Sequence, residues 1–233
     1  MTSPPPLRGI SSMATRQVLA ELTAAYAARA PQAGPVQIES VGGVEVAKRV
    51  AAGEAFDMVI LASDAIDKLL AAGHLLPGSK VDWVHSGVAV AVPAGAPLPD
   101  LGTEDAVRDA VLAARSISLS TGPSGVALAK LFERWGIAEQ IAPRMVQAPP
   151  GVPVGSLVAK GEVALGFQQL SELLHVQGIQ IVGPLPPAIQ ITTTFSAGVG
   201  ALSQQVDAAR ALLAYLASPA AAEAKRKQGM TPA

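Results

Sequence analysis

The sequence contains no cysteine and only three histidines, His74, His85 and His175, which are widely spaced. Disulfide bonds and thiol nucleophiles are therefore excluded. A zinc site or an iron–sulfur cluster would lack the ligands that such sites normally use. We accordingly expect neither a metal site nor a cofactor.

Aromatic residues make up 3% of the 233 residues and charged residues 15%, and the formal net charge is −1. The chain has no run of Lys and Arg and few rings on which bases could stack, which argues against nucleic acid as a partner. No apolar stretch approaches the roughly 20 residues that span a bilayer, so we expect no membrane insertion. The length suits one large domain or two smaller lobes.

The first six residues, Met1–Pro6, have neither the basic start nor the apolar core of a secretory leader. As the sequence stands, we expect a cytoplasmic protein. The expectation becomes periplasmic if a leader has been removed.

Short runs typical of β-strands alternate with helical patterns along almost the whole chain. Residues 58–61 form a continuous apolar run of the kind found in buried parallel strands. The remaining strands are predicted at 36–40, 86–92, 116–120, 145–148, 163–167, 180–182 and 192–200. Helices are predicted at 44–52, 65–72, 104–114, 125–135, 153–160, 170–174, 207–217 and 220–227. This alternation predicts right-handed βαβ units and an α/β fold.

Four strand-to-helix turns combine small residues, hydroxyl groups and glycine directly before a helix. They contain Ser11 and Ser12, Gly42 and Gly43, Thr121 and Ser124, and Gly151 and Val152. The carboxyl ends of parallel strands meet at one sheet edge, and helix N-termini offer free N–H groups to anions. One such turn alone is most simply an ordinary loop or cap. Four at one edge predict an anion-binding site.

Several stretches also carry a family resemblance. Residues 7–22 form a strand, a small-residue turn and a helix, and residues 215–233 form a last helix closed by Gly229 and Pro232. Residues 43–61 and 160–167 each lead from a helix end through glycine into an apolar strand. In order and spacing, these stretches resemble the molybdate-binding-protein-like branch of the type II periplasmic solute-binding proteins. That branch includes relatives described as aconitate isomerases.

The resemblance implies a two-lobed α/β fold of type II, in which each lobe is a mainly parallel sheet flanked by helices. The extended stretches 87–93 and 192–200 would be two hinge strands. Lobe one would then comprise residues 1–86 plus 198–233, and lobe two residues 87–197. The resemblance also implies a small anionic ligand clamped between the lobes by hinge closure and, for a transport receptor, an ABC transporter permease as partner.

In the molybdate binders of this family, a serine from each of the first two turns holds the oxyanion, together with lobe-two N–H groups and a tyrosine. This chain keeps Ser12, but it has Gly42 and Gly43 at the second turn and Gln168 nearest the tyrosine position. Arg16, in the first turn of the first helix, could hold a carboxylate through two parallel hydrogen bonds; its alternative is an ordinary surface arginine. We therefore expect an organic carboxylate as ligand, with molybdate or tungstate next.

The alternative function is that of an isomerase that interconverts the cis and trans forms of a small unsaturated polycarboxylate such as aconitate. That reaction needs a base that removes an allylic proton. His85, Glu45 and Lys130 are the nearest candidates, although each also fits an ordinary role, as a loop histidine, a first-turn helix acid and a solvated lysine. The turn at 122–125 lacks the lysine of a phosphate-binding loop, so a kinase is not indicated.

Overall fold

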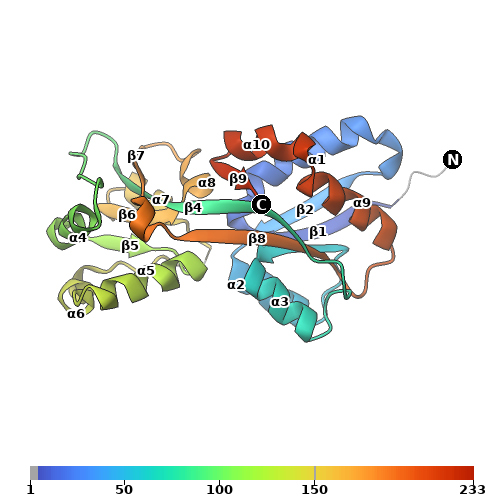
Figure 1. Cartoon of the computed structure of the whole chain (residues 1–233), viewed down its shortest axis with the longest axis horizontal. Coiled ribbons are helices and arrows are strands. Elements are labelled where there is room, and N and C mark those ends of the chain that lie inside the picture. Colours follow the sequence, from blue (N-terminus) through green and yellow to red (C-terminus); the bar gives the residue numbers. More distant parts are fainter. Residues whose placement is uncertain (1–4, 150) are drawn as a thin grey trace. The chain divides into compact units, whose positions relative to one another are not determined.

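The structure is a computed structural model that describes residues 5–149 and 151–233. Pro150, which belongs to one of the predicted turns, lies outside the described residues. The chain forms two compact units: unit 1 is Met1–His85 with Thr194–Ala233, and unit 2 is Ser86–Thr193. Two strands, β4 (Val81–Pro93) and β8 (Thr192–Val199), each contribute residues to both units (Figure 1).

Unit 1 is built on a sheet with the strand order β2-β1-β3-β8, formed by β1 (Leu7–Ser12), β2 (Val36–Val41), β3 (Met58–Ala62) and the unit-1 part of β8. β1 pairs in parallel with β2 and with β3, whereas β3 and β8 are antiparallel. All five residues of β3 are buried, as its continuous apolar sequence predicts for a central strand.

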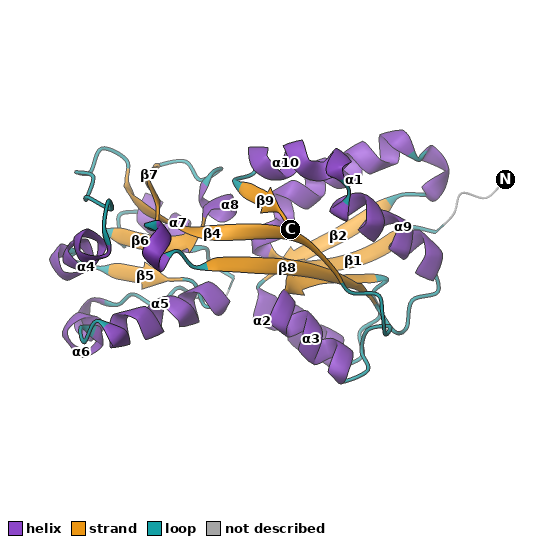
Figure 2. Ribbon diagram, in the orientation of Figure 1, coloured by secondary structure: helices purple, strands orange, loops and turns teal. Residues whose placement is uncertain are grey.

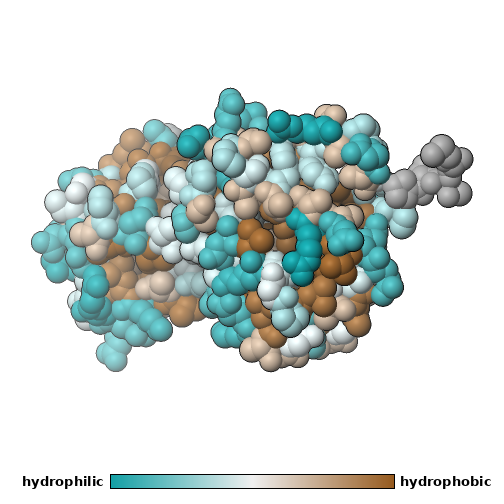
Figure 3. All heavy atoms as spheres, turned by 45° about the vertical axis from the view of Figure 1, so that its right-hand side comes forward, coloured by the Kyte–Doolittle hydropathy of each residue, from teal (hydrophilic) through white to brown (hydrophobic). Residues whose placement is uncertain are grey.

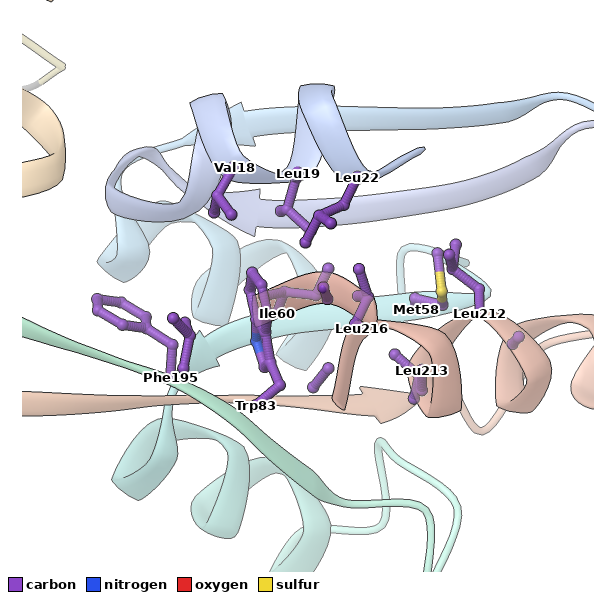
Figure 4. Packing of buried hydrophobic residues seen from close by; sticks show 14 of the residues in the cluster. Val18, Leu19, Leu22, Met58, Ile60, Trp83, Phe195, Leu212, Leu213 and Leu216 are labelled. Atoms are coloured by element: carbon purple, nitrogen blue, oxygen red, sulfur yellow. The ribbon is translucent and has the colours of Figure 1, made fainter. Parts of the chain in front are cut away.

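Helices cover both faces of this sheet. α1 (Arg16–Arg29), α9 (Val206–Ala217) and α10 (Ala222–Lys227) lie on one face, and α2 (Gly43–Ala51) and α3 (Ser63–Ala71) on the other (Figures 1 and 2). The first face holds a core in which α1 and α9 pack over the sheet (Figure 4); its members include Val18, Leu19, Leu22, Ile60, Trp83, Leu212 and Leu216. Burying one such aliphatic side chain contributes about 1.5–3 kcal/mol, so this core fixes where β1 and α1 meet.

Asp57 holds together segments of unit 1 that are far apart in the sequence. Its carboxylate accepts the Arg8 N–H at 2.8 Å and the Ser203 hydroxyl at 2.6 Å. Asp57, directly before β3, therefore has a structural role: it aligns the start of β1 with the start of β3.

Unit 2 has the strands β5 (Ile117–Leu119), β6 (Leu165–Gln169) and β7 (Ile179–Pro184) with the unit-2 part of β4. β5 and β6 are parallel, and β6 and β7 each pair with β4 in antiparallel fashion. Its helices are α4 (Glu104–Ala113), α5 (Pro123–Arg134), α6 (Ala138–Ile141), α7 (Val154–Ala159) and α8 (Leu170–Leu173). Gly166 lets α7 pack closely on β6, because a Cβ there would lie 2.5 Å from the Val158 side chain.

Short 3-10 helices complete the secondary structure: η1 (Met13–Thr15), η2 (Pro31–Ala33), η3 (Ala142–Arg144), η4 (Pro187–Ile189) and η5 (Pro219–Ala221). The last strand, β9 (Met230–Pro232), pairs with β4. None of the described helices is both long enough and apolar enough to cross a bilayer. The face drawn in Figure 3 mixes hydrophilic and hydrophobic residues.

Some sequence-based predictions of single elements are wrong. The strand predicted at 145–148 is reduced to one bridge, between Met145 and Ile117. β4 begins at Val81 rather than at residue 86, because Asp82 and His85 find hydroxyl partners in β8 and so tolerate a strand position. α3 begins at Ser63, two residues earlier than the helix predicted from residue 65.

Candidate functional site

In unit 1, the predicted first turn lies where β1 ends and η1 leads directly into α1. Ser11 Oγ lies 2.8 Å from Ser40 Oγ, so the hydroxyl of Ser11 is used within the sheet. Ser12 is 7% exposed, and among the described residues its Oγ has no hydrogen-bond partner. A buried hydroxyl without a partner costs about 1–3 kcal/mol, and a ligand acceptor would remove that cost.

The second predicted turn meets the first one at Ser12. A Cβ built on Gly43 would lie 3.8 Å from the Ser12 Cβ, and one built on Gly42 would meet nothing within 4 Å. Gly42 has φ −58°, which any residue adopts, so the backbone does not require glycine there. The glycines therefore leave space beside Ser12 at the N-terminus of α2. We call Ser12, Gly42 and Gly43 the serine–glycine corner.

Two charged candidates lie in the first turns of the helices that follow the residues of the serine–glycine corner. Arg16 is the first residue of α1 and is exposed, and no acidic side chain among the described residues pairs with it. Glu45 is an exposed residue of the first turn of α2. Both positions leave the side chain accessible, and the roles predicted for Arg16 and Glu45 stay predictions.

In unit 2, the third predicted turn begins α5. Ser124 is 3% exposed and its Oγ lies 2.9 Å from Ser120 Oγ, whereas Thr121 is exposed. Gly122 has open space around it, but a Cβ on Gly125 would fall 1.6 Å from the Ser120 carbonyl oxygen. Because this carbonyl lies so close, a side chain at position 125 would clash with it, and the backbone at the start of α5 packs directly against Ser120.

The fourth predicted turn and Gln168 lie together in unit 2. Gly151 has φ +77°, a conformation that favours glycine, and Val152 donates its N–H to the Pro149 carbonyl at 3.0 Å. Two residues later α7 begins, and the Gly155 N–H donates to Gln168 Oε1 at 3.0 Å. Gln168 is 3% exposed, so its amide oxygen is used within unit 2; its role as a ligand contact stays a prediction.

Glu172, on α8, is the functional candidate that the sequence analysis missed. Gln168 Nε2 donates to Glu172 Oε1 at 2.9 Å. Burial raises the pKa of Glu172 to about 7, against the smaller lowering effect of the Gln168 hydrogen bond. The Gln-x-x-x-Glu spacing across the end of β6 was the only sequence pattern that pointed to this pair. The burial that raises the pKa of the carboxyl cannot be predicted from that spacing.

The other two acid–base candidates lie in separate units. His85 is in the unit-1 part of β4, and its Nδ1 is 3.0 Å from Thr194 Oγ1. Lys130 is an exposed residue in the middle of α5 in unit 2. Among the described residues, no group of three or more His, Asp or Glu side chains is placed to hold a metal ion.

Residues 7–231 match the family described as bacterial extracellular solute-binding protein. The chain is 42% identical over 188 residues to a protein named aconitate isomerase from Pseudomonas sp, covering 80% of this chain and 71% of that one.

Solved structures show the same fold. The periplasmic molybdate-binding protein of Azotobacter vinelandii has a TM-score of 0.79 at 22% identity, covering 97% of this chain and 98% of that one. The sulfate-binding protein of Mycobacterium tuberculosis has a TM-score of 0.79 at 17% identity, with 98% and 87% covered. The tungstate-binding protein of Desulfovibrio alaskensis has a TM-score of 0.70 at 14% identity, with 99% of each chain covered.

These likenesses confirm the two-lobed type II fold that the sequence resemblance implies. The family match extends over nearly the whole chain, from the start of β1 into β9. The chain therefore belongs to the family of bacterial extracellular solute-binding proteins.

Proposed function

We propose that this protein binds a small unsaturated polycarboxylate of the aconitate type and interconverts its cis and trans isomers. The observation that carries the proposal is the 42% identity to an aconitate isomerase, against 14–22% to the molybdate-, sulfate- and tungstate-binding proteins of the same fold. Fold alone does not distinguish these ligands, so the sequence relationship is the stronger support for an aconitate-type ligand.

The serine–glycine corner supports an organic ligand. A tetrahedral oxyanion presents a small, densely charged surface and is best satisfied by several donors at close range. Here Ser12 carries one unpartnered buried hydroxyl, and the neighbouring Gly42 and Gly43 add no side chains that would take up space. A carboxylate on a larger carbon skeleton fills that space and still accepts the Ser12 hydrogen bond. The exposed guanidinium of Arg16 is available to a second carboxylate.

The chemistry requires only a proton transfer. A base removes a proton from the CH2 carbon of aconitate, the electron pair of that C–H bond forms a new double bond, and the former vinylic carbon takes up a proton. Rotation within the delocalised intermediate selects the cis or trans product. No oxidant, reductant or second substrate enters the reaction.

A second candidate function is binding without chemical change, in which the protein delivers its ligand to an ABC transporter outside the cytoplasm. Membership of the extracellular solute-binding family favours it. In that case the ligand remains a small anion, but the protein has no turnover.

One pair of measurements separates the two functions. A thermal-shift panel with cis-aconitate, trans-aconitate, citrate, molybdate, tungstate and sulfate identifies the ligand, because ligand at a hundred times its Kd adds about 2.7 kcal/mol of stability. Proton NMR of each aconitate incubated with the protein then reports turnover. Stabilisation by an aconitate with conversion of one isomer into the other supports the isomerase, and stabilisation without conversion supports the receptor. Stabilisation by molybdate or tungstate alone would overturn the polycarboxylate ligand.

A further inference from the structure

A linked set of polar groups lies at the carboxyl end of β6 in unit 2. The Gly155 N–H donates to Gln168 Oε1, and Gln168 Nε2 donates to Glu172 Oε1. Because the backbone N–H can only donate, it fixes which end of the Gln168 amide is the oxygen. The NH2 end must then face Glu172. The same sheet edge holds the turn into α5, since β5 and β6 run parallel.

The Glu172 carboxyl has a neutral partner rather than a cationic one. Within residues 5–149 and 151–233, the one hydrogen bond to this carboxyl comes from Gln168, and no Lys, Arg or His side chain forms an ion pair with it. β6 packs against α8, and α7 approaches it where Gly155 meets Leu173; neither β6 nor α7 contains a titratable residue. The nearest such residues along the chain are Glu162, before β6, and His175, after α8; both are exposed.

A carboxyl of this kind differs from those elsewhere in the protein. Hydrogen bonds from Arg49 lower the pKa values of Glu39 and Glu54, and hydrogen bonds from Trp135 and then Arg134 lower that of Glu104. A carboxylate locked in an ion pair is a poor base because giving up its charge breaks the pair. Glu172 is instead partly buried beside an uncharged amide, so it can take up a proton and release it again without losing an ion-pair partner.

We propose that Glu172 is the general base and acid of the aconitate isomerisation, with Gln168 as its positioning residue. The proposal rests on the proposed function. The Glu172 carboxylate takes the proton from the CH2 carbon of the bound ligand, and the electron pair of the broken C–H bond becomes the new double bond. The resulting carboxylic acid returns the proton to the carbon at the other end of the three-carbon system. Glu172 therefore ends the reaction in the same protonation state in which it began.

The acid–base properties of the group fit this role. Burial raises the pKa of Glu172 to about 7, and a base whose pKa lies near the working pH combines the correct protonation state with sufficient basicity. The three candidates from the sequence are a histidine bonded to Thr194 and two exposed helix residues, Glu45 and Lys130. None of these three side chains is hydrogen-bonded to the Gln168 amide, as Glu172 is.

The decisive variant is Glu172→Gln, which keeps the size of the side chain and removes its ability to exchange a proton. We expect a loss of isomerisation of about 100-fold or more, the usual contribution of a general base, while the thermal shift with trans-aconitate is retained. The matched control is Glu133→Gln, an identical change at an exposed position of α5, which leaves turnover unchanged. Turnover by Glu172→Gln within a few-fold of wild type would overturn the proposal.

A second measurement uses the pH profile and does not depend on how well Glu172→Gln folds. In wild type, kcat rises with pH through about 7, because the base must be deprotonated to act. Gln168→Met removes the hydrogen bond that favours the charged carboxylate, so the rise should move to higher pH. An unmoved profile in Gln168→Met would contradict the coupling between the two residues.

The two proposals fail in different ways. If the wild-type protein does not interconvert the aconitates, the proposed isomerase function is wrong. If the wild-type protein turns over and Glu172→Gln does so equally well, the function stands and only the assignment of Glu172 is wrong.

Discussion

The ammonium group of Lys225 donates a hydrogen bond to the Trp83 carbonyl oxygen at 2.6 Å and lies 5.6 Å from the centre of the Trp83 ring system. Lys225 is 1% exposed, and none of the carboxylates in the described part of the chain pairs with it. Burial lowers its pKa from 10.5 to about 8. A cation is thus held against the core of unit 1 by a carbonyl group and an aromatic face, which only partly replace its hydration.

This arrangement predicts an unusual dependence of stability on pH. Between about pH 8 and pH 10, the unfolded chain keeps the Lys225 proton while the folded protein loses it, so the free energy of unfolding rises with pH. Lys225→Met should abolish that rise and increase the free energy of unfolding at pH 7 by about 1–3 kcal/mol. Urea unfolding at about pH 7 and about pH 9.5 measures both effects.

The control for Lys225 is Lys68→Met, at a position where the side chain is 81% exposed. This variant should keep the pH dependence of wild type. A Lys225→Met protein whose stability still rises with pH as in wild type would mean that another group titrates in this range.

Ser11 and Ser12 are neighbours whose removal should have opposite effects. Ser12→Ala deletes a buried hydroxyl without a partner, so the free energy of unfolding without ligand should stay the same or rise by up to about 1 kcal/mol. The thermal shift produced by trans-aconitate should shrink. Ser11→Ala breaks the contact with Ser40 Oγ and should lower stability by about 1 kcal/mol. If Ser12→Ala left the ligand-induced shift intact, the serine–glycine corner would not be a binding site.

Gly42 offers a test of ligand preference. A serine fits there without steric conflict and adds a hydroxyl at the N-cap of α2, which is worth a few tenths of a kcal/mol in stability. Gly42→Ser should weaken the thermal shift with trans-aconitate and strengthen that with molybdate, because it fills space and adds a donor. Gly42→Ala is the matched control, since it fills space alone. Equal molybdate responses from the two variants would show that the hydroxyl plays no part.

The turn into α5 contains two glycines with different requirements. Gly125→Ala places a Cβ 1.6 Å from the Ser120 carbonyl oxygen, and the resulting displacement should lower the free energy of unfolding by about 3 kcal/mol. Gly122→Ala meets no atom within 4 Å and should cost less than about 1 kcal/mol. Urea unfolding of both variants compares them directly. Similar losses in the two would mean that the approach of Ser120 is not what restricts Gly125.

Most helices and strands were predictable because their hydrophobic patterns are local. β3 is marked by an unbroken apolar run, and α4 begins where Thr103 accepts the Ala106 N–H as a cap. β9 was missed because its stability comes from pairing with β4, a partner about 140 residues distant in the sequence. The first part of β4 was missed for a similar reason: Asp82 bonds to Ser196 across the sheet, so the strand looks too polar when read alone.

The candidate site was predictable where chain order alone brings residues together. Ser12 and Gly43 lie at the ends of adjacent parallel strands, and the structure places them side by side. Glu172 could not be selected in the same way. Its distinguishing property is a partly buried environment in which its partner, the Gln168 amide, is uncharged. The spacing of residues in the sequence predicts neither this burial nor the lack of a cationic partner among the described residues.

The hydrogen bond from Gly155 to Gln168 makes the backbone of α7 a spectroscopic reporter. When Glu172 changes its protonation state, the polarisation of the Gln168 amide changes, and the Gly155 N–H at the other end of that amide experiences a different acceptor. The amide resonance of Gly155 should therefore titrate with Glu172, although glycine itself has no ionisable group. Two-dimensional NMR of the uniformly labelled protein could then follow the proton on a single carboxyl through every ligand state without altering that carboxyl.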